Sequence, residues 1–340
     1  MARIALDAMG GDHAPQATVA GALLAAAELD PSHSITLVGQ AARIEQTLDT
    51  LLHGEHAALA GHRGRLHVVD APDVIDMAEK PTAAIRGKPN SSMMVGLRLH
   101  AEGQADAFVS AGNTGAQMAA SMVLLRLYAG IKRPAIATIF PTGKQPVVVL
   151  DSGANVDCSA AELVQFARLG SVYAHDMLGR ERPAVGLLNI GEEAEKGNAV
   201  SKEAHALLAQ SGLHFVGNVE GRDLPAGCNH NGPLDVVVCD GFVGNVILKF
   251  YEAVAPLMVG LLVKAGMDQQ RIMTALRDLD YSEHGGAPLL GVRGVSIICH
   301  GRSSPRAIKN AIKVAVQAVD NRLVDHLGKR MEDAAGGAAA

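Results

Sequence analysis

Short apolar runs recur along the chain, and each ends directly in a small, glycine-rich polar cluster. These clusters occupy residues 7–13, 110–115, 151–155, 189–193, 217–218, 239–241 and 299–304. The runs are rich in valine and isoleucine without polar alternation, which predicts strands buried on both faces of a parallel, helix-covered sheet. Ligands bind beyond the carboxyl ends of the strands in such a sheet. The pattern therefore predicts one sheet whose loops form one large site.

Alanine- and leucine-rich segments with helical spacing separate the apolar runs. The predicted helices cover residues 16–29, 41–52, 91–102, 115–128, 159–177, 196–210, 244–265, 268–279 and 305–327. No proline- or serine-rich linker interrupts this alternation. We therefore expect one compact α/β domain over residues 1–330, with a helical segment at 244–280 and a disordered tail at 331–340.

Charge and cysteine content narrow the class of protein. The 340 residues include 30 Lys and Arg against 35 Asp and Glu, a net charge of −5, which argues against nonspecific nucleic-acid binding. The four cysteines form no CxxC pair, so the spacing indicates neither a zinc site nor a disulfide framework. The chain starts in a predicted strand without a secretory signal. We expect a protein of the reducing cytoplasm.

The first glycine cluster opens a predicted helix. Gly10 and Gly11 form a tight turn there, and backbone amides at a helix start can face an anion. Taken alone, the cluster is explained better as a turn that needs glycine for positive φ, with Asp12 as a helix cap. The cluster is not a GxGxxG dinucleotide fingerprint.

The cluster at 110–115 leads directly into another predicted helix. Asn113 and Thr114 either donate to a phosphate or carbonyl oxygen, or cap that helix, and one loop can do both. Gly115 completes the turn. No lysine follows at the P-loop position, so a Walker-type nucleotide site is not indicated.

Other strand ends supply charged and titratable side chains. The acidic turn at 192–195 fits a solvated first helical turn, and we assign no metal to it. Lys196 is a cation at the loop edge that can neutralise an anionic substrate. Cys239 and Cys299 follow buried runs and are expected to be core hydrophobes. His300 can move protons, and Ser303 stands at the start of the last long helix.

Six segments carry a family resemblance that runs in order from about residue 3 to residue 325. They are IALDAMGGDHAP (4–15), VSAGNTGA (109–116), LDSGANVDC (150–158), LLNIGEEAEKGN (187–198), DVVVCDGFVGNVILK (235–249) and GGAPLLGVRGVSIICHGRSS (285–304). Together they resemble the bacterial PlsX family, the phosphate acyltransferases of phospholipid synthesis. Ala194 departs from the family, which commonly has a third consecutive Glu there, and this weakens any role for the acidic turn.

The resemblance implies a three-layer α/β/α, Rossmann-like doubly wound fold, similar to isocitrate and isopropylmalate dehydrogenases and to phosphotransacetylase. It implies a homodimer that transfers a long-chain fatty acyl group from an acyl carrier protein thioester to inorganic phosphate. The acyl phosphate product would go to a membrane glycerol-3-phosphate acyltransferase. Long-chain acyl-CoA is an alternative donor. No metal or organic cofactor is implied.

This chemistry fits a chain without a GxSxG elbow, because phosphate is itself anionic and nucleophilic and needs no covalent enzyme intermediate. The protein must then position two anions and stabilise an oxyanion. The residues predicted to bind phosphate are Gly10, Gly11, Asn113, Thr114, Gly115 and Ser303. Lys196 and His300 are predicted to neutralise charge and to protonate or stabilise the leaving thiolate, and Asp12 and Asp240 to orient them.

Two other classes remain open. A nicotinamide-dependent dehydrogenase of the isopropylmalate type would need a metal-binding acidic cluster and a nicotinamide site, and the sequence spells out neither. A noncatalytic scaffold for lipid-synthesis enzymes is the second alternative. Because acyl carrier proteins are acidic, a basic patch is expected, and Arg126, Lys132 and Arg133 are candidates for it or are ordinary solvated charges.

The apolar helix predicted at 244–265 has two readings. Its apolar positions are Phe250, Val254, Leu257, Met258, Leu261 and Ala265, and the tip adds Val259, Leu262 and Val263. The stripe fits a dimer interface, whereas the tip fits reversible contact with a membrane through a few apolar side chains and Lys264. The uncharged stretch 255–263 is too short to span a bilayer. We expect a protein peripherally associated with the inner face of the cell membrane.

Overall fold

The computed structural model describes residues 1–275 and 285–336 and forms two compact units. Unit 1 combines Met1–Ala129 with His284–Ala340, and unit 2 is Gly130–Glu283. The domain expected over residues 1–330 therefore consists of two units. No proline- or serine-rich segment marks the places where the chain passes from one unit to the other. The lack of such a linker in the sequence therefore did not indicate how many units the chain forms.

Unit 1 is built on a parallel sheet with buried strands. In sequence order these are β1 (Arg3–Asp7), β2 (Ser34–Gly39), β3 (Leu66–Asp70), β4 (Ala107–Ser110), β13 (Ala287–Leu290) and β14 (Val295–Ile298). Their spatial order is β3-β2-β1-β4-β14-β13, and only the β13–β14 pair is antiparallel. The first, second and last glycine clusters thus follow β1, β4 and β14, which are neighbours.

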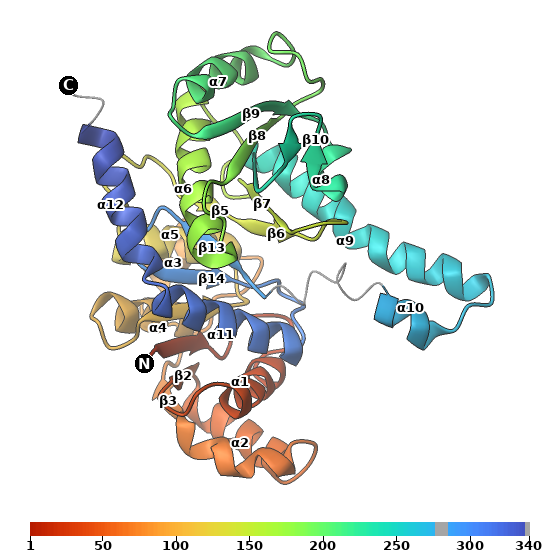
Figure 1. Ribbon diagram of the computed structural model, residues 1–340. Coiled ribbons are helices and arrows are strands. Elements are labelled where there is room, and N and C mark those ends of the chain that lie inside the picture. The colour runs from red at the N-terminus through yellow and green to blue at the C-terminus, as the bar shows by residue number, and fades with distance from the viewer. Residues whose placement is uncertain (276–284, 337–340) are drawn as a thin grey trace. The chain divides into compact units, whose positions relative to one another are not determined.

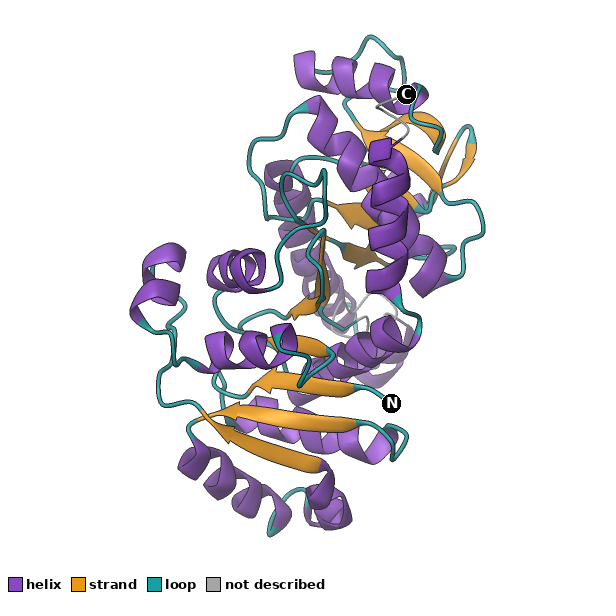
Figure 2. Ribbon diagram, turned by 90° about the vertical axis from the view of Figure 1, so that its left-hand side faces the viewer, coloured by secondary structure: helices purple, strands orange, loops and turns teal. Residues whose placement is uncertain are grey.

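Helices cover both faces of this sheet (Figure 2). They are α1 (Gln16–Glu28), α2 (Ala41–Leu52), α3 (Pro81–Gly87), α4 (Ser92–Ala101), α5 (Thr114–Leu124), α11 (Pro305–Asp320) and α12 (Leu323–Gly336), with a 3-10 segment at Ala57–Arg65. The helix predicted at 305–327 is interrupted at Arg322, whose φ is 55°. Residues 331–336 of the expected disordered tail continue α12, and residues 337–340 lie outside the described part of the chain.

Unit 2 has its own sheet. Its strands are β6 (Thr138–Phe140), β7 (Val147–Leu150), β8 (Ala184–Leu188), β9 (His214–Val219) and β12 (Val236–Val238). Their order is β6-β7-β12-β8-β9, parallel except for β6–β7. The prediction of a single sheet is therefore wrong, whereas the predicted α/β class with parallel, helix-covered strands is confirmed.

Unit 2 contains further helices and short strands besides the strands of that sheet (Figure 1). They are β5 (Ala135–Ile136), α6 (Ala160–Leu178), α7 (Ala199–Ala209), α8 (Asp223–Ala226), the hairpin β10 (Cys228–Asn229) and β11 (Gly232–Pro233), α9 (Gly241–Lys264) and α10 (Gln269–Ala275). The predicted segment 244–280 corresponds to α9 and α10, and its residues 276–280 lie outside the described residues.

The long helix α9 changes surroundings along its length. In its first half, Ile247, Leu248 and Tyr251 pack against the core of unit 2. Its second half continues beyond the sheet of that unit (Figure 1), and no residue after Gly244 is fully buried. Among the described residues, α9 is the one helix whose length and apolar composition would allow it to cross a membrane.

Candidate active site

Three glycine loops meet at the carboxyl edge of the unit 1 sheet. The amide of Asp12 donates to the carbonyl of Gly301 at 2.7 Å, which ties the loop after β1 to the loop after β14. A Cβ on Gly11 would lie 3.0 Å from that carbonyl and 3.2 Å from Ala111 Cβ. The unit 1 residues that this edge brings together are Gly10, Gly11, Asp12, Asn113, Thr114, Gly115, His300 and Ser303.

A buried carboxylate that the sequence analysis did not single out organises two of these loops. Asp7, at the end of β1, accepts from Ser110 Oγ at 2.7 Å and from the amide of Met9 at 3.1 Å. Burial raises the pKa of this carboxyl, opposed by its hydrogen bonds. The only signal in the sequence was an acidic residue placed directly after a buried run.

Close approach explains the glycine at position 10. A Cβ there would lie 2.6 Å from Asp7 Oδ2 and 2.8 Å from the amide nitrogen of Gly112. Gly10 therefore allows the loops after β1 and β4 to lie close together, which a larger side chain would prevent. Gly11, at φ 107°, needs glycine for its backbone conformation.

The side chain of Asn113 is fully engaged within unit 1. Its Oδ1 accepts from the amide of Ala116 at 3.0 Å and caps α5. Its Nδ2 donates to the carbonyls of Met77 and Glu79, both at 3.0 Å. Capping and loop anchoring therefore account for this side chain, so any phosphate contact here falls to the main chain.

The first turn of α5 retains free donors. Within the described residues, the amides of Thr114 and Gly115 have no hydrogen-bond partner, as expected for the first positions of a helix. A Cβ on Gly115 would lie 2.6 Å from Pro81 Cγ, so α3 packs directly against this turn. These two amides are the donors best placed for an anion at the positive end of α5.

We expect Asn113→Ala to lower stability by about 1 kcal/mol through loss of the cap and to raise KM for phosphate about fivefold. Asn113→Ser is the matched control, since serine restores a capping oxygen without the amide donors. Urea unfolding and initial rates against phosphate concentration measure the two effects. A folded alanine variant with unchanged phosphate dependence would remove this loop from phosphate binding.

The loop after β14 fixes the tautomer of His300. The amide of Arg302 donates to His300 Nδ1 at 3.2 Å, so the neutral imidazole carries its proton on Nε2. Ser303 donates its amide to the carbonyl of His300 at 2.9 Å, and its hydroxyl has no partner among the described residues. Arg302 is exposed, with Nε 3.9 Å from Asp12 Oδ2. This edge thus offers a hydroxyl, an imidazole N–H and a cation.

The other two predicted catalytic residues lie in unit 2. Lys196 is exposed in the turn after β8, with no ion-pair partner in the described residues. That turn is anchored where Asn189 Nδ2 donates to the carbonyl of Lys196 at 3.1 Å and Asn218 Nδ2 to that of Glu193 at 2.7 Å. Asp240 follows the neighbouring strand β12 and caps α9 by accepting from the amide of Val243 at 2.8 Å.

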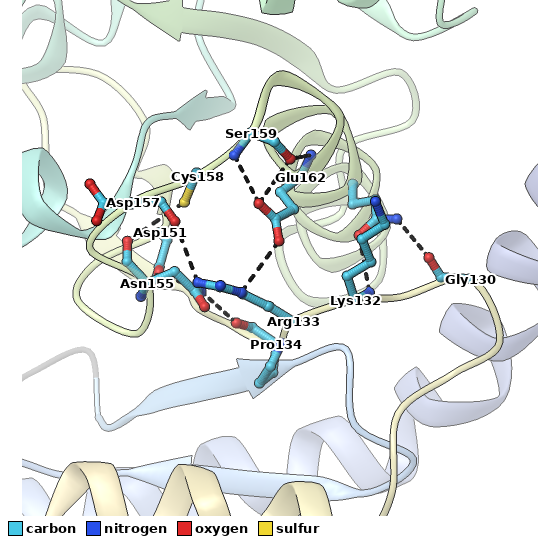
Figure 3. Close-up of polar contacts among 11 residues, drawn as sticks. Gly130, Lys132, Arg133, Pro134, Asp151, Asn155, Asp157, Cys158, Ser159 and Glu162 are labelled. Carbon is cyan, nitrogen blue, oxygen red and sulfur yellow. Dashed lines mark hydrogen bonds and ion pairs between the residues drawn. The ribbon is translucent and has the colours of Figure 1, made fainter. Parts of the chain in front are cut away.

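A second buried carboxylate organises the unit 2 edge (Figure 3). Asp151 accepts from the amides of Ile136 at 3.0 Å and Ala154 at 3.1 Å, and from both nitrogens of Asn155 at 2.6 and 2.8 Å. Burial raises the pKa of this carboxyl too. Asp151 thus lies directly after β7, much as Asp7 ends β1.

Of the candidate residues for carrier-protein binding, Arg133 has side-chain partners among the described residues. Arg133 Nε lies 3.4 Å from Glu162 Oε1, and its Nη1 donates to the carbonyl of Asp157 (Figure 3). Lys132 donates its amide to Gln165. Arg126, in unit 1, has φ 64°. Glu162 offsets part of the charge of Arg133, and the basic patch stays a prediction.

The acidic turn is held by ion pairs. Glu192 lies 3.3 Å from Arg222 Nη2 and 3.1 Å from His230 Nδ1. Among the described residues, no three His, Cys, Asp or Glu side chains are grouped so as to hold a metal ion. The acidic turn is therefore a loop ahead of α7, which begins at Ala199 and has no acidic residue in its first turn, so the expected first helical turn is wrong.

Both strand-end cysteines are buried, as predicted for core hydrophobes. Burial raises the pKa of the Cys299 thiol to about 12 and that of Cys239 well above its usual value. Neither is therefore a thiolate near neutral pH.

We expect Cys239→Ala and Cys299→Ala to lose some stability but to retain acyl transfer. Mass spectrometric detection of an acyl thioester on either residue would contradict this expectation.

Solved structures share this two-unit α/β architecture. A phosphotransacetylase from Streptococcus pyogenes is 16% identical, with a TM-score of 0.61 over 94% of both chains. A branched-chain phosphotransacylase from Enterococcus faecalis gives 0.60 at 16% identity, over 94% of this chain and 99% of its own. A 4-hydroxythreonine-4-phosphate dehydrogenase from Klebsiella pneumoniae gives 0.52 at 15% identity, over 94% and 100%. The fold class is therefore that of the phosphotransacetylases, and the predicted Rossmann-like α/β fold is confirmed.

Sequence relatives define the family. The family model described as "fatty acid synthesis protein" matches residues 2–326. A phosphate acyltransferase from Desulforamulus reducens is 49% identical over 98% of both chains, and one from Heliobacterium modesticaldum is 48% identical over 97% of this chain and 99% of its own. The chain belongs to this family, the PlsX phosphate acyltransferases, and is an acyltransferase of fatty acid and phospholipid synthesis.

Proposed function

We propose that this protein transfers a long-chain fatty acyl group from an acyl carrier protein thioester to inorganic phosphate and releases acyl phosphate for phosphatidic acid synthesis. The observation that carries the proposal is the pair of free amides on Thr114 and Gly115 at the start of α5, among three glycine loops. Such amides hold a phosphate without any cationic side chain. The family relationship supplies the acyl transfer.

The reaction balances without a covalent enzyme intermediate. An oxygen of hydrogen phosphate bonds to the thioester carbon, the carbon–sulfur bond breaks, and the proton carried by the phosphate ends on the leaving sulfur. His300 Nε2–H donates a hydrogen bond to the negative charge that develops in the transition state, and Lys196 neutralises that charge. Asp240 and Asp12 orient the groups around them. The buried, un-ionised cysteines support direct attack.

Formation of the product tests the function. Purified protein is incubated with palmitoyl-acyl carrier protein and radiolabelled phosphate, and a labelled lipid that hydroxylamine destroys is the expected acyl phosphate. A noncatalytic scaffold would give no product. A dehydrogenase would instead change the absorbance of NAD in the presence of a hydroxy acid.

The family resemblance implies the partners. Acyl carrier protein delivers the substrate, a second copy of the chain completes a homodimer, and a membrane glycerol-3-phosphate acyltransferase consumes the product. We place the protein in the cytoplasm, in peripheral contact with the inner face of the cell membrane. The second half of α9 supports this placement, because Leu257, Leu261 and Val263 are exposed there beside Lys264.

We expect the double substitution Leu261→Glu and Leu262→Glu to abolish cosedimentation with anionic liposomes, because two carboxylates oppose both apolar insertion and the anionic surface. Dimerisation and activity on soluble palmitoyl-acyl carrier protein should persist. Sedimentation and size-exclusion chromatography measure the two properties. If the double variant becomes monomeric, or if the wild-type protein does not sediment, this segment is a subunit interface and not a membrane anchor.

A further inference from the structure

Three loops at the carboxyl edge of the unit 2 sheet each expose a large apolar side chain. Val156 follows β7, Phe242 follows β12 and Ile190 follows β8, and their exposed fractions are 62%, 61% and 82%. A soluble protein seldom leaves such residues grouped in solvent without a use for them.

Sheet register places these residues on neighbouring loops. Val238 pairs with Leu150 on one side and with Leu187 on the other, so β7, β12 and β8 end at the same level. The amide of Gly241 donates to the carbonyl of Asn155 at 2.7 Å, which joins the first two loops directly. The residues after Asn155 and Gly241 are Val156 and Phe242. The apolar positions thus form one band along this edge, called here the apolar edge.

The corresponding edge of unit 1 has a different character. Its loops 7–13, 110–115 and 299–304 contain no exposed large hydrophobic residue among those described, and offer amides, a hydroxyl and an imidazole instead. Phosphate suits that polar edge. A binding site for a hydrocarbon needs apolar walls with few polar groups, and the loops of the unit 2 edge expose three large apolar side chains.

The apolar edge adjoins predicted reacting groups. Asp240 is two residues before Phe242, and Lys196 is in the same turn as Ile190. The edge also continues along α9 at helical spacing through Val246 and Phe250, both exposed. A chain attached to a carbon near Lys196 would therefore find apolar contacts at once and along the start of α9. A membrane or a second subunit needs no such closeness to the reacting groups.

We propose that the apolar edge formed by Val156, Ile190 and Phe242 binds the hydrocarbon chain of the acyl donor. This inference rests on the proposed function and assigns the acyl chain to the loops at the carboxyl edge of the unit 2 sheet. Chain length is then sensed by the number of methylene groups that reach Phe242 and the start of α9. Short acyl groups gain little from these contacts.

The test compares acyl chains of two lengths. In Ile190→Asn and Phe242→Asn, kcat/KM for palmitoyl-acyl carrier protein should fall about tenfold, while that for butyryl-acyl carrier protein changes less than about twofold. KM for phosphate should stay unchanged. Both side chains are exposed, so these substitutions spare the core. Leu207→Asn is the matched control, because Leu207 is an exposed leucine of unit 2 on α7 and should alter neither donor.

The outcomes separate this inference from the function on which it rests. If the wild-type protein makes no acyl phosphate from either donor, the proposed function fails. If it does, but the variants lose activity on both donors equally or on neither, the apolar edge does not bind the chain. A variant that becomes monomeric by size-exclusion chromatography assigns the edge to a subunit interface. Binding of dodecyl phosphate, measured by calorimetry and weakened in both variants, supports the inference without turnover.

Discussion

Substitution of Lys196 by methionine is expected to lower kcat/KM for phosphate by about 10² to 10³, the usual effect of removing one electrostatic stabiliser of a transition state. The expectation follows from the charge balance of the reaction. Two anions, phosphate and the developing oxyanion, must coexist, and Lys196 is an exposed cation at the sheet edge without an ion-pair partner in the described residues. Methionine retains the length of the side chain and removes only its charge.

Two further variants make this result specific. Lys202→Met removes the charge of another exposed lysine, which lies on the following helix α7. This substitution should leave kcat/KM for phosphate within about twofold of the wild-type value. Lys196→Arg retains the charge with a different geometry and should recover part of the loss. If Lys196→Met and Lys202→Met behave alike, Lys196 contributes only to the general field of the protein and has no direct part in the reaction.

The sequence predicted the loops of the site well because their signals are local. A buried run followed by glycine and a capping residue is sufficient to define a strand, a turn and a helix start, and this logic located β4, Asn113 and α5. The same logic located Asp240 at the start of α9. Helix caps depend on residues within one turn, so a single sequence contains all that is needed.

The division into two sheets depended on information that no local pattern contains. A fully apolar run shows that a strand is buried on both faces, but not which strand lies beside it. β14 pairs with β4, although Val295 and Ala107 are far apart in the chain. The seven runs were therefore assigned to one sheet, and the chain was treated as one unit.

Side-chain roles were predicted less well than loop positions. Asn113 was predicted to bind phosphate, but its amide is committed to the carbonyls of Met77 and Glu79, which come from a segment that showed no motif. Asp7 was overlooked because burial of a carboxylate among hydroxyls and amides leaves no mark in the sequence. The roles assigned to Lys196, His300 and the glycine loops stay predictions.

The second large effect is expected from Gly244→Ala, which should destabilise unit 2 by about 3 kcal/mol although alanine favours helices. A Cβ on Gly244 would lie 1.9 Å from the carbonyl oxygen of Asp151. That oxygen is a main-chain atom of Asp151, which Figure 3 labels. No rotamer change can therefore relieve the clash. The start of α9 must move away from the loop after β7, and Asp240 and Phe242 move with it.

Gly260→Ala in the same helix provides the matched comparison. A Cβ on Gly260 meets nothing within 4 Å, so alanine there should leave stability unchanged or raise it by up to about 1 kcal/mol through helix propensity alone. Urea midpoints by circular dichroism, with amide exchange in α9, should therefore shift in opposite directions for the two variants. Acyl transfer should fall only in Gly244→Ala, because of these two glycines only Gly244 packs against Asp151. Equal stability of the two variants would mean that the start of α9 can separate from Asp151 at no cost, and that the carboxyl edge of unit 2 is not held together by this contact.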